Sequence, residues 1–508
     1  MNERMELLEK RWRSLCEVYL PVARPGEIWR LSRLATESDP TQGWKLHISA
    51  TILTACDVLE VAAPIFQRLD SLYKAPASLL ELRRINAGLY YGFSQVGKFI
   101  TVYPRRVEDA LRIAEEVDAA TQGLPCPRVP SDRSLRDESC VFYRYGAFRA
   151  SHIDRDRSDD HEGGWTICAP DGSLIPDKRT RDAAVPFWER DPFLQLGRPT
   201  RPDDSGATPL KTTYRAYEAI SQRGKGGVYK AINLRYSPAR RCIIKEGRMN
   251  GETDWDGTDG FQRIVNEKRI LERLLGHGVP VAQIVDYFIV GRTNFLVLES
   301  VDGALLHSMI TRKKKLPIHE ALLCGAKLAE TLGAIHDAGV AWRDCKPLNL
   351  IVDGSHRLRP FDFEGACLAD EVPLQPWGTF GYAPPEWLED FGSRRVETED
   401  LYALGATLHH IFSGRPPESD TRPPPIGTLR RGIPSEVRGI VSSLMDADPG
   451  SRPAAPVVAA ALFSAHARSI RDLGLARRDT SSARLADGGG VVLDEIYEGM
   501  ATAGPMTG

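Results

Sequence analysis

One short segment, WRDCKPLN at residues 342–349, constrains what this chain can fold into more than any other feature. An apolar run follows it, and FDFE at residues 361–364 comes next. Phosphoryl transfer needs a carboxylate to accept the proton of the attacking hydroxyl, a cation beside the γ-phosphate, and oxygen ligands for Mg²⁺. The two segments supply these groups in the expected order. We therefore predict two catalytic residues and two metal ligands, namely Asp344, Lys346, Asn349 and Asp362.

A glycine-rich run follows a short apolar stretch upstream of this segment. Glycine lacks a Cβ, so the backbone N–H groups of such a run can approach phosphate oxygens closely. A glycine run by itself is more often only a turn. With the downstream motifs, however, it predicts a nucleotide-binding turn made of Gly224, Gly226, Gly227 and Val228.

A lysine and a glutamate complete the predicted nucleotide site. Lys245 closes the apolar run 242–244, and lysine is scarce in this chain, since only 15 of its 66 basic residues are Lys. Glu267 shares the apolar face of a predicted helix within 259–275, where an unpaired carboxylate would be costly. We predict that Lys245 pairs with Glu267 and points to the α- and β-phosphates. Glu299 is also predicted to bind the nucleotide.

Together these motifs resemble the eukaryotic-type protein kinases over residues 220–452. The resemblance continues with the run PPE that ends at Glu386, with Asp400 in DLYALG and with Arg452 in DPGSRP. It implies a two-lobed kinase fold that uses ATP or GTP with Mg²⁺. It also implies a buried ion pair between Glu386 and Arg452.

Three features depart from that family pattern. Trp342 replaces the usual His, Glu364 replaces the Gly that follows Asp-Phe, and the glycine run is one residue shorter. None of these changes removes a catalytic group, and Glu364 should restrict the backbone beside Asp362. Thr379 is the only Ser or Thr between Glu364 and Pro384, which predicts that phosphorylation of this loop is not an activating switch.

Two lysine-bearing runs in the first 150 residues also stand out. In GWKLHIS, strand alternation puts Lys45 and His47 on the same side. In SQVGKFITVYP, Lys98 begins a second strand-like run, while PSDR and FYRYGAF place Arg133 and Arg144 near turns. Taken alone, each feature has a bland explanation, because a strand histidine is often structural and an arginine between aromatic residues often only stacks.

With the kinase motifs behind them, these runs resemble the N-terminal phosphoserine/phosphothreonine lyase domain of class III lanthipeptide synthetases, the LanKC type. That domain is in turn similar to the phosphothreonine lyases. The resemblance implies that Lys98 is the base that removes the α-proton and that His47 is the acid that protonates the leaving oxygen. It also implies phosphate binding by Lys45, Arg133 and Arg144.

The resemblance implies a substrate as well. This would be a ribosomally synthesised precursor peptide with a leader and a core, phosphorylated on Ser or Thr and then dehydrated. Full-length relatives carry a C-terminal cyclase domain, for which residues 466–508 are too few. A separate cyclase, a product left as dehydroamino acids and a truncated chain all remain open.

These observations predict an α+β protein with a phosphothreonine-lyase-like domain followed by a two-lobed protein-kinase-like domain. We expect the lyase-like domain with a linker over 1–205, the Ser/Thr kinase-like domain over 206–465 and a weakly structured tail over 466–508. The 66 basic and 68 acidic residues leave a net charge of −2, which argues against nucleic acid or an anionic membrane as a partner. No apolar run is long enough to cross a bilayer, and we expect a cytoplasmic protein.

Two other functions fit the same residues. The chain could be a signalling Ser/Thr kinase whose N-terminal domain binds a partner without catalysis. It could also be a non-catalytic scaffold, a pseudokinase that keeps its motifs and recruits a peptide. The mass of a candidate precursor after incubation with nucleotide and Mg²⁺ separates the three functions, through loss of water, stable gain of phosphate, or no change.

Overall fold

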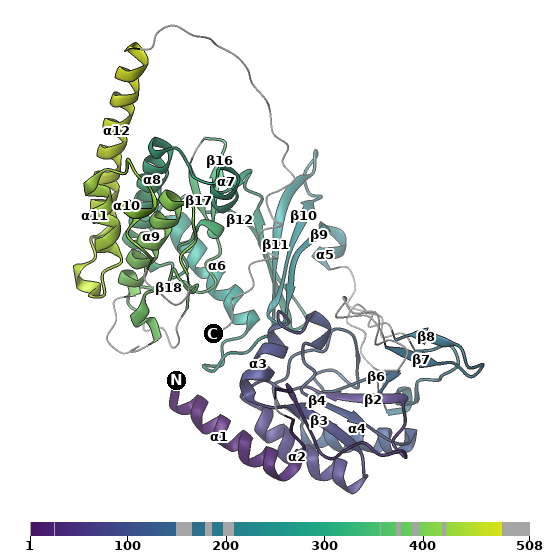
Figure 1. Cartoon of the computed structure of the whole chain (residues 1–508). Helices are drawn as coiled ribbons and strands as arrows, with labels where there is room; N and C mark the ends of the chain where they lie inside the picture. Colours follow the sequence, from purple (N-terminus) through teal and green to yellow (C-terminus); the bar gives the residue numbers. More distant parts are fainter. Residues whose placement is uncertain are drawn as a thin grey trace.

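The computed structural model of this chain has two regions with separate hydrophobic cores (Figure 1). No helix among the described residues combines the length and the apolar composition needed to cross a bilayer. The structure describes residues 2–24, 26–148, 165–177, 185–196, 208–355, 357–371, 377–388, 396–418 and 423–479.

The N-terminal region, purple and blue in Figure 1, is a six-stranded antiparallel sheet packed against helices. The strand order is β1-β3-β4-β2-β6-β5, so β2 lies inside the sheet between β4 and β6. The apolar residues of α2 and α4 pack into the core of this region. The strands are β1 (Trp29–Leu31), β2 (Gln42–Ile48), β3 (Leu72–Pro76), β4 (Ile100–Tyr103), β5 (Arg133–Ser134) and β6 (Val141–Ala147), and the helices are α1 (Asn2–Tyr19), α2 (Ala55–Arg68), α3 (Leu79–Ala87) and α4 (Val107–Ala120).

Local sequence signals set the ends of helix α3. The Ser78 side chain accepts a hydrogen bond from the Glu81 N–H at 3.1 Å, which caps the first turn. Gly88 ends the helix with φ of 74°, a backbone conformation that glycine adopts without a steric penalty. The smaller elements of the region are η1 (Phe93–Gln95), the hairpin of β7 (Thr166–Cys168) and β8 (Leu174–Pro176), and η3 (Pro192–Leu196).

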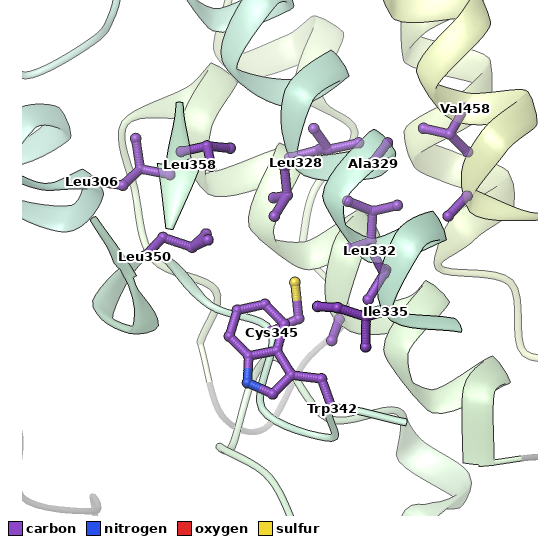
Figure 2. Packing of buried hydrophobic residues seen from close by; sticks show 14 of the residues in the cluster. Leu306, Leu328, Ala329, Leu332, Ile335, Trp342, Cys345, Leu350, Leu358 and Val458 are labelled. Carbon is purple, nitrogen blue, oxygen red and sulfur yellow. The ribbon is translucent and has the colours of Figure 1, made fainter. Parts of the chain in front are cut away.

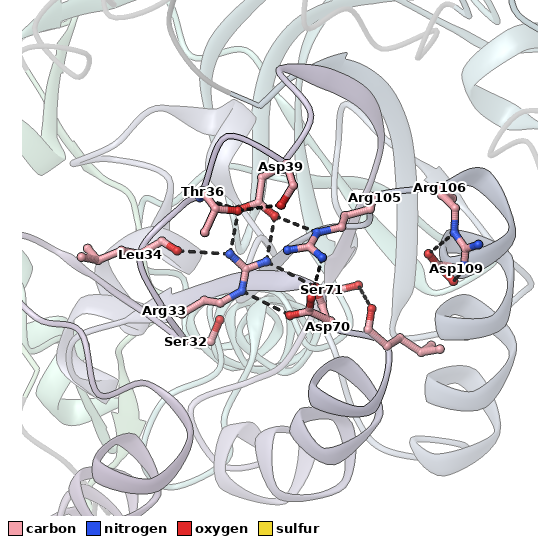
Figure 3. Close-up of polar contacts among 12 residues, drawn as sticks. Ser32, Arg33, Leu34, Thr36, Asp39, Asp70, Ser71, Arg105, Arg106 and Asp109 are labelled. Atoms are coloured by element: carbon pink, nitrogen blue, oxygen red, sulfur yellow. Dashed lines mark hydrogen bonds and ion pairs between the residues drawn. The ribbon is translucent and has the colours of Figure 1, made fainter.

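An ion-pair network ties three loops of the N-terminal region together (Figure 3). Arg33 Nη1 lies 2.7 Å from Asp39 Oδ2, and Arg105 Nε lies 3.1 Å from Asp39 Oδ1. Asp70 contacts both arginines from a third loop. The hydrogen bond from Arg33 lowers the pKa of Asp39, so this carboxylate stays charged and the network is structural.

The N-lobe of the second region is a five-stranded antiparallel sheet in the order β12-β13-β11-β10-β9 with α6 beside it. Helix α6 begins with a capping box, in which the Asp259 carboxylate accepts the Gln262 N–H and the Gln262 side chain accepts the Asp259 N–H. The elements are α5 (Pro209–Thr212), β9 (Tyr214–Arg223), β10 (Gly226–Asn233), β11 (Arg240–Arg248), α6 (Gly260–Gly276), β12 (Ile284–Val290) and β13 (Thr293–Glu299).

The C-lobe is mainly helical, and its core forms around α8 and α9. Figure 2 shows Trp342 and Cys345 packed beneath Leu332 and Ile335 of α8, with Val458 of α12 on the far side. The C-lobe helices are α7 (Leu306–Lys313), α8 (Ile318–Asp337), η4 (Pro347–Asn349), η5 (Pro385–Leu388), α9 (Val396–Ser413), α10 (Ile426–Leu429), α11 (Ser435–Leu444), η6 (Pro449–Ser451) and α12 (Ala455–Asp479), and its short strands are β14 (Gly303–Leu305), β15 (Val340–Ala341), β16 (Leu350–Asp353), β17 (Leu358–Pro360) and β18 (Cys367–Leu368).

The segment 249–259, which joins β11 to α6, rests on the N-terminal region. Trp255 is 5% exposed and belongs to the hydrophobic core of that region. Asp254 pairs with Arg83 of α3 at 3.1 Å, and Asn250 Nδ2 donates to the Cys126 carbonyl at 3.2 Å. The two regions are therefore joined by the buried Trp255 side chain as well as by polar contacts.

The structure confirms the predicted α+β class and the kinase-like division into a sheet-rich lobe and a helical lobe. It differs from the prediction at the start of the tail, because α12 runs through residue 466 to Asp479. Val458 and Leu462 pack the first turns of α12 against the C-lobe core. The residues that follow them favour helix and continue it. Residues 480–508 of the expected tail lie outside the described residues.

Candidate active sites

The first candidate site lies in the loop between β15 and η4. Lys346 Nζ is 2.8 Å from Asp344 Oδ2, and Asn349 Nδ2 donates to the same oxygen at 2.8 Å. Thr379 joins them, since its hydroxyl donates to Asp344 Oδ1 and accepts from Lys346 Nζ, both at 2.7 Å. The structure thus brings three predicted residues together. From the sequence, Thr379 was predicted only as a residue of the loop whose phosphorylation was in question, and its contacts with Asp344 and Lys346 were not predicted.

Buried contacts fix the backbone of this loop. The Asp400 carboxylate accepts the N–H of Trp342 at 2.7 Å and that of Arg343 at 2.6 Å. Trp342 is fully buried, and its ring centroid lies 5.5 Å from that of Phe363. Its indole N–H donates to the Asp362 carbonyl at 3.3 Å. Trp342, the departure from the usual His, therefore links the loop to the predicted metal ligand.

Lys245 makes the predicted ion pair and a second one. Its Nζ lies 2.7 Å from Glu267 Oε1 and 2.9 Å from Asp362 Oδ1. Burial alone would lower the pKa of Lys245, but the charges of Asp362 and Glu267 outweigh it and raise that pKa well above its usual value. Lys245 is consequently a fixed cation, as a partner for phosphate oxygens must be.

The donor set at Asp362 and Asn349 fits a hard divalent cation. The Phe361 N–H donates to the Asn349 carbonyl at 3.1 Å, which brings the two segments together. Because Asn349 directs its Nδ2 to Asp344, its amide oxygen is left for a metal. The nearby positive charge of Lys245 helps to lower the pKa of Asp362 against the opposing effect of burial. A charged carboxylate and an amide oxygen are ligands that Mg²⁺ accepts.

The glycine turn differs from the prediction. Gly224 and Lys225 connect β9 to β10, and the Gly224 N–H donates to the Ala87 carbonyl of the N-terminal region at 3.0 Å. A Cβ on Gly224 would lie 1.7 Å from the Asn86 carbonyl oxygen, so close packing requires glycine here. Lys225 Nζ pairs with Glu364, next to the predicted metal ligand. The Gly224 amide thus serves a contact between regions instead of the phosphate contact that we predicted.

The other predicted nucleotide-binding residues lie at strand ends near Lys245. Gly226 and Gly227 begin β10, and Val228 pairs with Lys245 across the β10–β11 ladder. Glu299 ends β13, where Arg359 Nη2 holds its carboxylate at 2.6 Å. The Glu299 carboxylate therefore already has a cationic partner, and a role toward a nucleotide stays a prediction.

The predicted ion pair between Glu386 and Arg452 is confirmed. Arg452 Nη2 lies 2.6 Å from Glu386 Oε1, and the Arg452 side chain is fully buried. The Arg452 guanidinium also donates to the carbonyl oxygens of Asp446 and Thr398, so it links η5, α9 and the turn before α12.

The second candidate site lies on one face of the N-terminal sheet. Lys45 and His47 alternate along β2, and Arg144 of β6 lies opposite Lys45 in the antiparallel ladder. Lys98 comes just before β4, the other neighbour of β2. All four side chains are buried. The sheet register therefore brings together residues that the sequence spreads over a hundred positions.

Asp132 lies between His47 and Lys98, and it was not among the residues predicted from the sequence. Its carboxylate makes a very short contact with His47 Nδ1, while Lys98 Nζ lies 3.8 Å from its other oxygen. Ser131 Oγ donates to that second oxygen at 3.0 Å. Burial would raise the pKa of Asp132, but the charges of His47 and Lys98 outweigh it and lower that pKa. A buried carboxylate between the predicted acid and the predicted base can orient both.

Burial also sets the charge of the other members of the cluster. It lowers the pKa of His47 to about 3, against the opposing effect of Asp132. It lowers the pKa of Lys45 well below the usual value, and the positive charges of Arg144 and Lys98 add to that effect. Burial thus favours the neutral forms of His47 and Lys45.

Arg133 is not part of the cluster, which corrects one predicted phosphate ligand. It pairs with Tyr143 in the β5–β6 ladder, and successive side chains of a strand point to opposite faces. Tyr143 belongs to the core on the other face of the sheet, so Arg133 faces away from Arg144 and His47. Its guanidinium binds Asp191 at 2.6 Å. Its sequence neighbour Asp132 points to the site instead.

Comparison with known families matches both regions. Residues 22–204 match the RamC N-terminal domain, and residues 214–463 match the protein kinase domain. The chain belongs to the proteins that join a RamC N-terminal domain to a protein kinase domain. The resemblance to class III lanthipeptide synthetases that the sequence predicted is thereby confirmed.

Individual relatives fall into two groups. A probable SapB synthase of Streptomyces coelicolor is 32% identical over 401 residues, which are 76% of this chain and 41% of that protein. The serine/threonine-protein kinase PknA of Mycobacterium tuberculosis is 28% identical over 263 residues, 48% of this chain and 58% of that kinase. PknK of Mycobacterium bovis is 28% identical over 274 residues, half of this chain and 24% of that kinase. This chain thus spans less than half the length of the synthase.

Proposed function

We propose that the protein is a two-site peptide dehydratase. Its kinase domain would phosphorylate Ser or Thr of a ribosomally synthesised precursor peptide, and its RamC domain would eliminate that phosphate to leave dehydroalanine or dehydrobutyrine. The observation that carries the proposal is the buried cluster of Lys98, His47 and Asp132, which a protein that only phosphorylates would not need.

In the kinase domain, Asp344 would accept the proton of the attacking Ser or Thr hydroxyl. Lys346, 2.8 Å from Asp344, would place positive charge beside the transferred phosphoryl group. Lys245, held by Glu267, would bind phosphate oxygens, and Asp362 with Asn349 would hold the metal. ATP with Mg²⁺ supplies the phosphoryl group and neutralises its charge when bound, and GTP is an alternative donor.

In the RamC domain, Lys98 Nζ would take the proton from Cα of the phosphorylated residue. The electron pair of that C–H bond forms the Cα=Cβ double bond while the Cβ–O bond breaks. Phosphate leaves with the electron pair of the broken bond, and His47 would give it a proton. Lys45 and Arg144, opposite each other on β2 and β6, would bind the phosphate oxygens.

His47 must carry an extra proton to act as this acid, because its Nδ1 faces Asp132 and its other nitrogen must donate. In the protein by itself, burial outweighs the charge of Asp132 and holds the pKa of His47 at about 3, so the ring is neutral. A phosphate group carries about −1.5 to −2 charges at neutral pH. Its arrival would raise the pKa of His47, so the substrate itself would load the acid.

A signalling serine/threonine kinase is the second candidate, and the similarity to PknA supports it. In that case the RamC domain would bind a partner without chemistry. The buried Lys98, His47 and Asp132 cluster is what favours the dehydratase, since burying these groups costs free energy that simple partner binding would not require.

The deciding experiment follows the mass of a candidate precursor peptide incubated with the full chain, ATP and Mg²⁺. Loss of one water per modified residue is expected for the dehydratase, whereas stable gain of phosphate would favour the signalling kinase. No change would favour a scaffold. A synthetic phosphoserine peptide, incubated without nucleotide, tests elimination separately and should lose phosphate. A separate cyclase, if one exists, would act on the dehydrated peptide.

A further inference from the structure

A carboxylate already occupies the proposed phosphate position of the RamC domain. Asp177 follows strand β8, and its carboxylate contacts Arg144 Nη2 directly. Its second oxygen lies 3.8 Å from Lys45 Nζ and accepts the Ala147 N–H at 3.1 Å. The Asp177 side chain is only 3% exposed. A guanidinium and a backbone N–H that contact one carboxylate, with the Lys45 amine 3.8 Å away, make a donor set for an anion.

Asp177 and a substrate phosphate would need the same donors. Lys45 and Arg144 lie opposite each other in the β2–β6 ladder, so one small anion between them satisfies both. The Asp177 carboxylate contacts Arg144 Nη2, so a phosphate that uses this nitrogen must displace it. A guanidinium buried without a counter-charge would cost free energy, and Asp177 removes that cost for Arg144.

We propose that Asp177 is an internal counter-anion that the phosphate of the substrate displaces, so the β7–β8 hairpin controls entry to the RamC site. This inference rests on the proposed elimination activity. Displacement exchanges a single negative charge for the larger charge of a phosphate, about −1.5 to −2, beside the same Arg144 guanidinium. The exchange therefore favours a phosphorylated residue over an unmodified Ser or Thr, which brings no anion.

The hairpin is attached in a way that permits such a movement. Gln42 holds it through two hydrogen bonds with the Cys168 backbone, at 2.6 and 2.8 Å. The Asp177 N–H donates to the Trp165 carbonyl at 2.7 Å, a contact within the hairpin itself. Ile167 of β7 is buried, whereas Leu174 of β8 is 49% exposed, so the strand that leads to Asp177 has the weaker apolar anchorage. Polar contacts of this kind open at a lower cost than a buried apolar core.

Asp191 shows the contrast and provides a matched control. It also pairs with an arginine, Arg133, and accepts a hydrogen bond from the Tyr143 hydroxyl at 3.1 Å. However, its neighbour Phe193 is 1% exposed and stacks on Tyr143 with 4.0 Å between ring centroids. Asp191 is therefore fixed in the core on the opposite face of the sheet, and no substrate needs to displace it.

The test compares the full-length wild type with Asp177→Asn and Asp191→Asn. Calorimetric titration with inorganic phosphate measures affinity, and a phosphoserine peptide without nucleotide measures KM and kcat for elimination. Removing the competing carboxylate should tighten phosphate binding and lower KM by about tenfold, because a larger fraction of the protein is competent to bind. Asp191→Asn should change neither value, although its thermal midpoint should fall.

Weaker or unchanged phosphate binding by folded Asp177→Asn would overturn the proposal, and Asp177 would then be a permanent partner that orients Arg144. If Asp177→Asn does not fold, Gln42→Ala decides, since loosening the hairpin should also tighten phosphate binding and an unchanged affinity would count against displacement. If the wild type eliminates nothing while Asp177→Asn still binds phosphate more tightly, the elimination activity fails and the counter-anion role stands.

Discussion

Two buried lysines show how the two halves of this protein treat the same side chain differently. The Lys245 side chain is 12% exposed and the Lys45 side chain is 8% exposed, so burial is similar. Lys245 lies within 3 Å of two carboxylates, and its pKa is raised. Lys45 lies near Arg144 and Lys98, with Asp177 no closer than 3.8 Å, and its pKa is lowered.

The difference teaches that neighbours, rather than depth, decide whether a buried lysine is a cation or a base. The kinase site surrounds its lysine with oxygen anions and so keeps a permanent positive charge for phosphate. The RamC site places Lys45 near Arg144 and Lys98, and these neighbours together with burial favour the neutral amine. The same residue type is therefore held as a cation in one half and favours its neutral form in the other.

The strongest test separates the two sites by substitution. Asp344→Asn should abolish phosphorylation of an unmodified precursor yet leave elimination from a phosphoserine peptide intact. Lys98→Ala should do the reverse, so the precursor accumulates with phosphate. A general acid or base contributes about 10²–10⁴-fold in rate, which mass spectrometry resolves easily. Lys98→Arg should not rescue, because a guanidinium stays protonated. Loss of both activities in either variant would contradict two independent sites.

A second test asks whether the halves fold as one unit. Trp255 of the kinase region is buried in the N-terminal core, and replacing a buried Trp by Ala costs about 3–5 kcal/mol. Trp255→Ala should therefore lower the thermal midpoint and separate the unfolding of the two regions in scanning calorimetry. Trp255→Phe keeps most of the apolar contact and should retain a single transition. An unchanged calorimetric trace for Trp255→Ala would show that the regions do not depend on this contact.

A third test sharpens the assignment of the proton-moving site. Asp132→Asn keeps the shape of the side chain but removes the charge that orients His47 and faces Lys98. Elimination should fall by about 10–100-fold, as expected for a residue that acts through others. The pH dependence of elimination should shift as well, whereas phosphorylation should not change. If Asp132→Asn kept full activity and the pH profile of the wild type, Asp132 would have no role in elimination.

The smallest effect is expected at Thr379, whose hydroxyl bridges Asp344 and Lys346. Thr379→Val should slow phosphorylation by about tenfold, close to the value of one hydrogen bond to a charged group. Thr379→Ser restores the hydroxyl and should keep most of the rate. Purified protein that carries no phosphate should already be active. If Thr379→Val and Thr379→Ser were equally slow, the methyl group and not the hydroxyl would matter.

The kinase site was predictable because its residues lie in short continuous motifs. Asp344, Lys346 and Asn349 fall within one loop, and Lys245 needed only one partner on the predicted helix. Gly224 was misassigned because its amide bonds to Ala87, a residue far away in the sequence and in the other region. No local pattern signals such a contact.

The RamC site was harder because its parts come from separate strands. Lys45, His47 and Lys98 came from a family resemblance, and the sheet then brought them together. Arg133 was predicted and Asp132 was missed for one reason, since adjacent residues point to opposite faces and only the register of β5 against β6 decides which one faces the site.

The hydrogen bond from Gly224 to Ala87 has a consequence for anyone who maps this protein by saturation mutagenesis. Both partners are main-chain atoms, so truncating side chains on either side of the contact leaves this hydrogen bond intact. Only added bulk can break it, because a Cβ on Gly224 would lie 1.7 Å from the Asn86 carbonyl oxygen. An alanine scan that skips glycines would therefore record no link between the two regions at a point where they are physically joined.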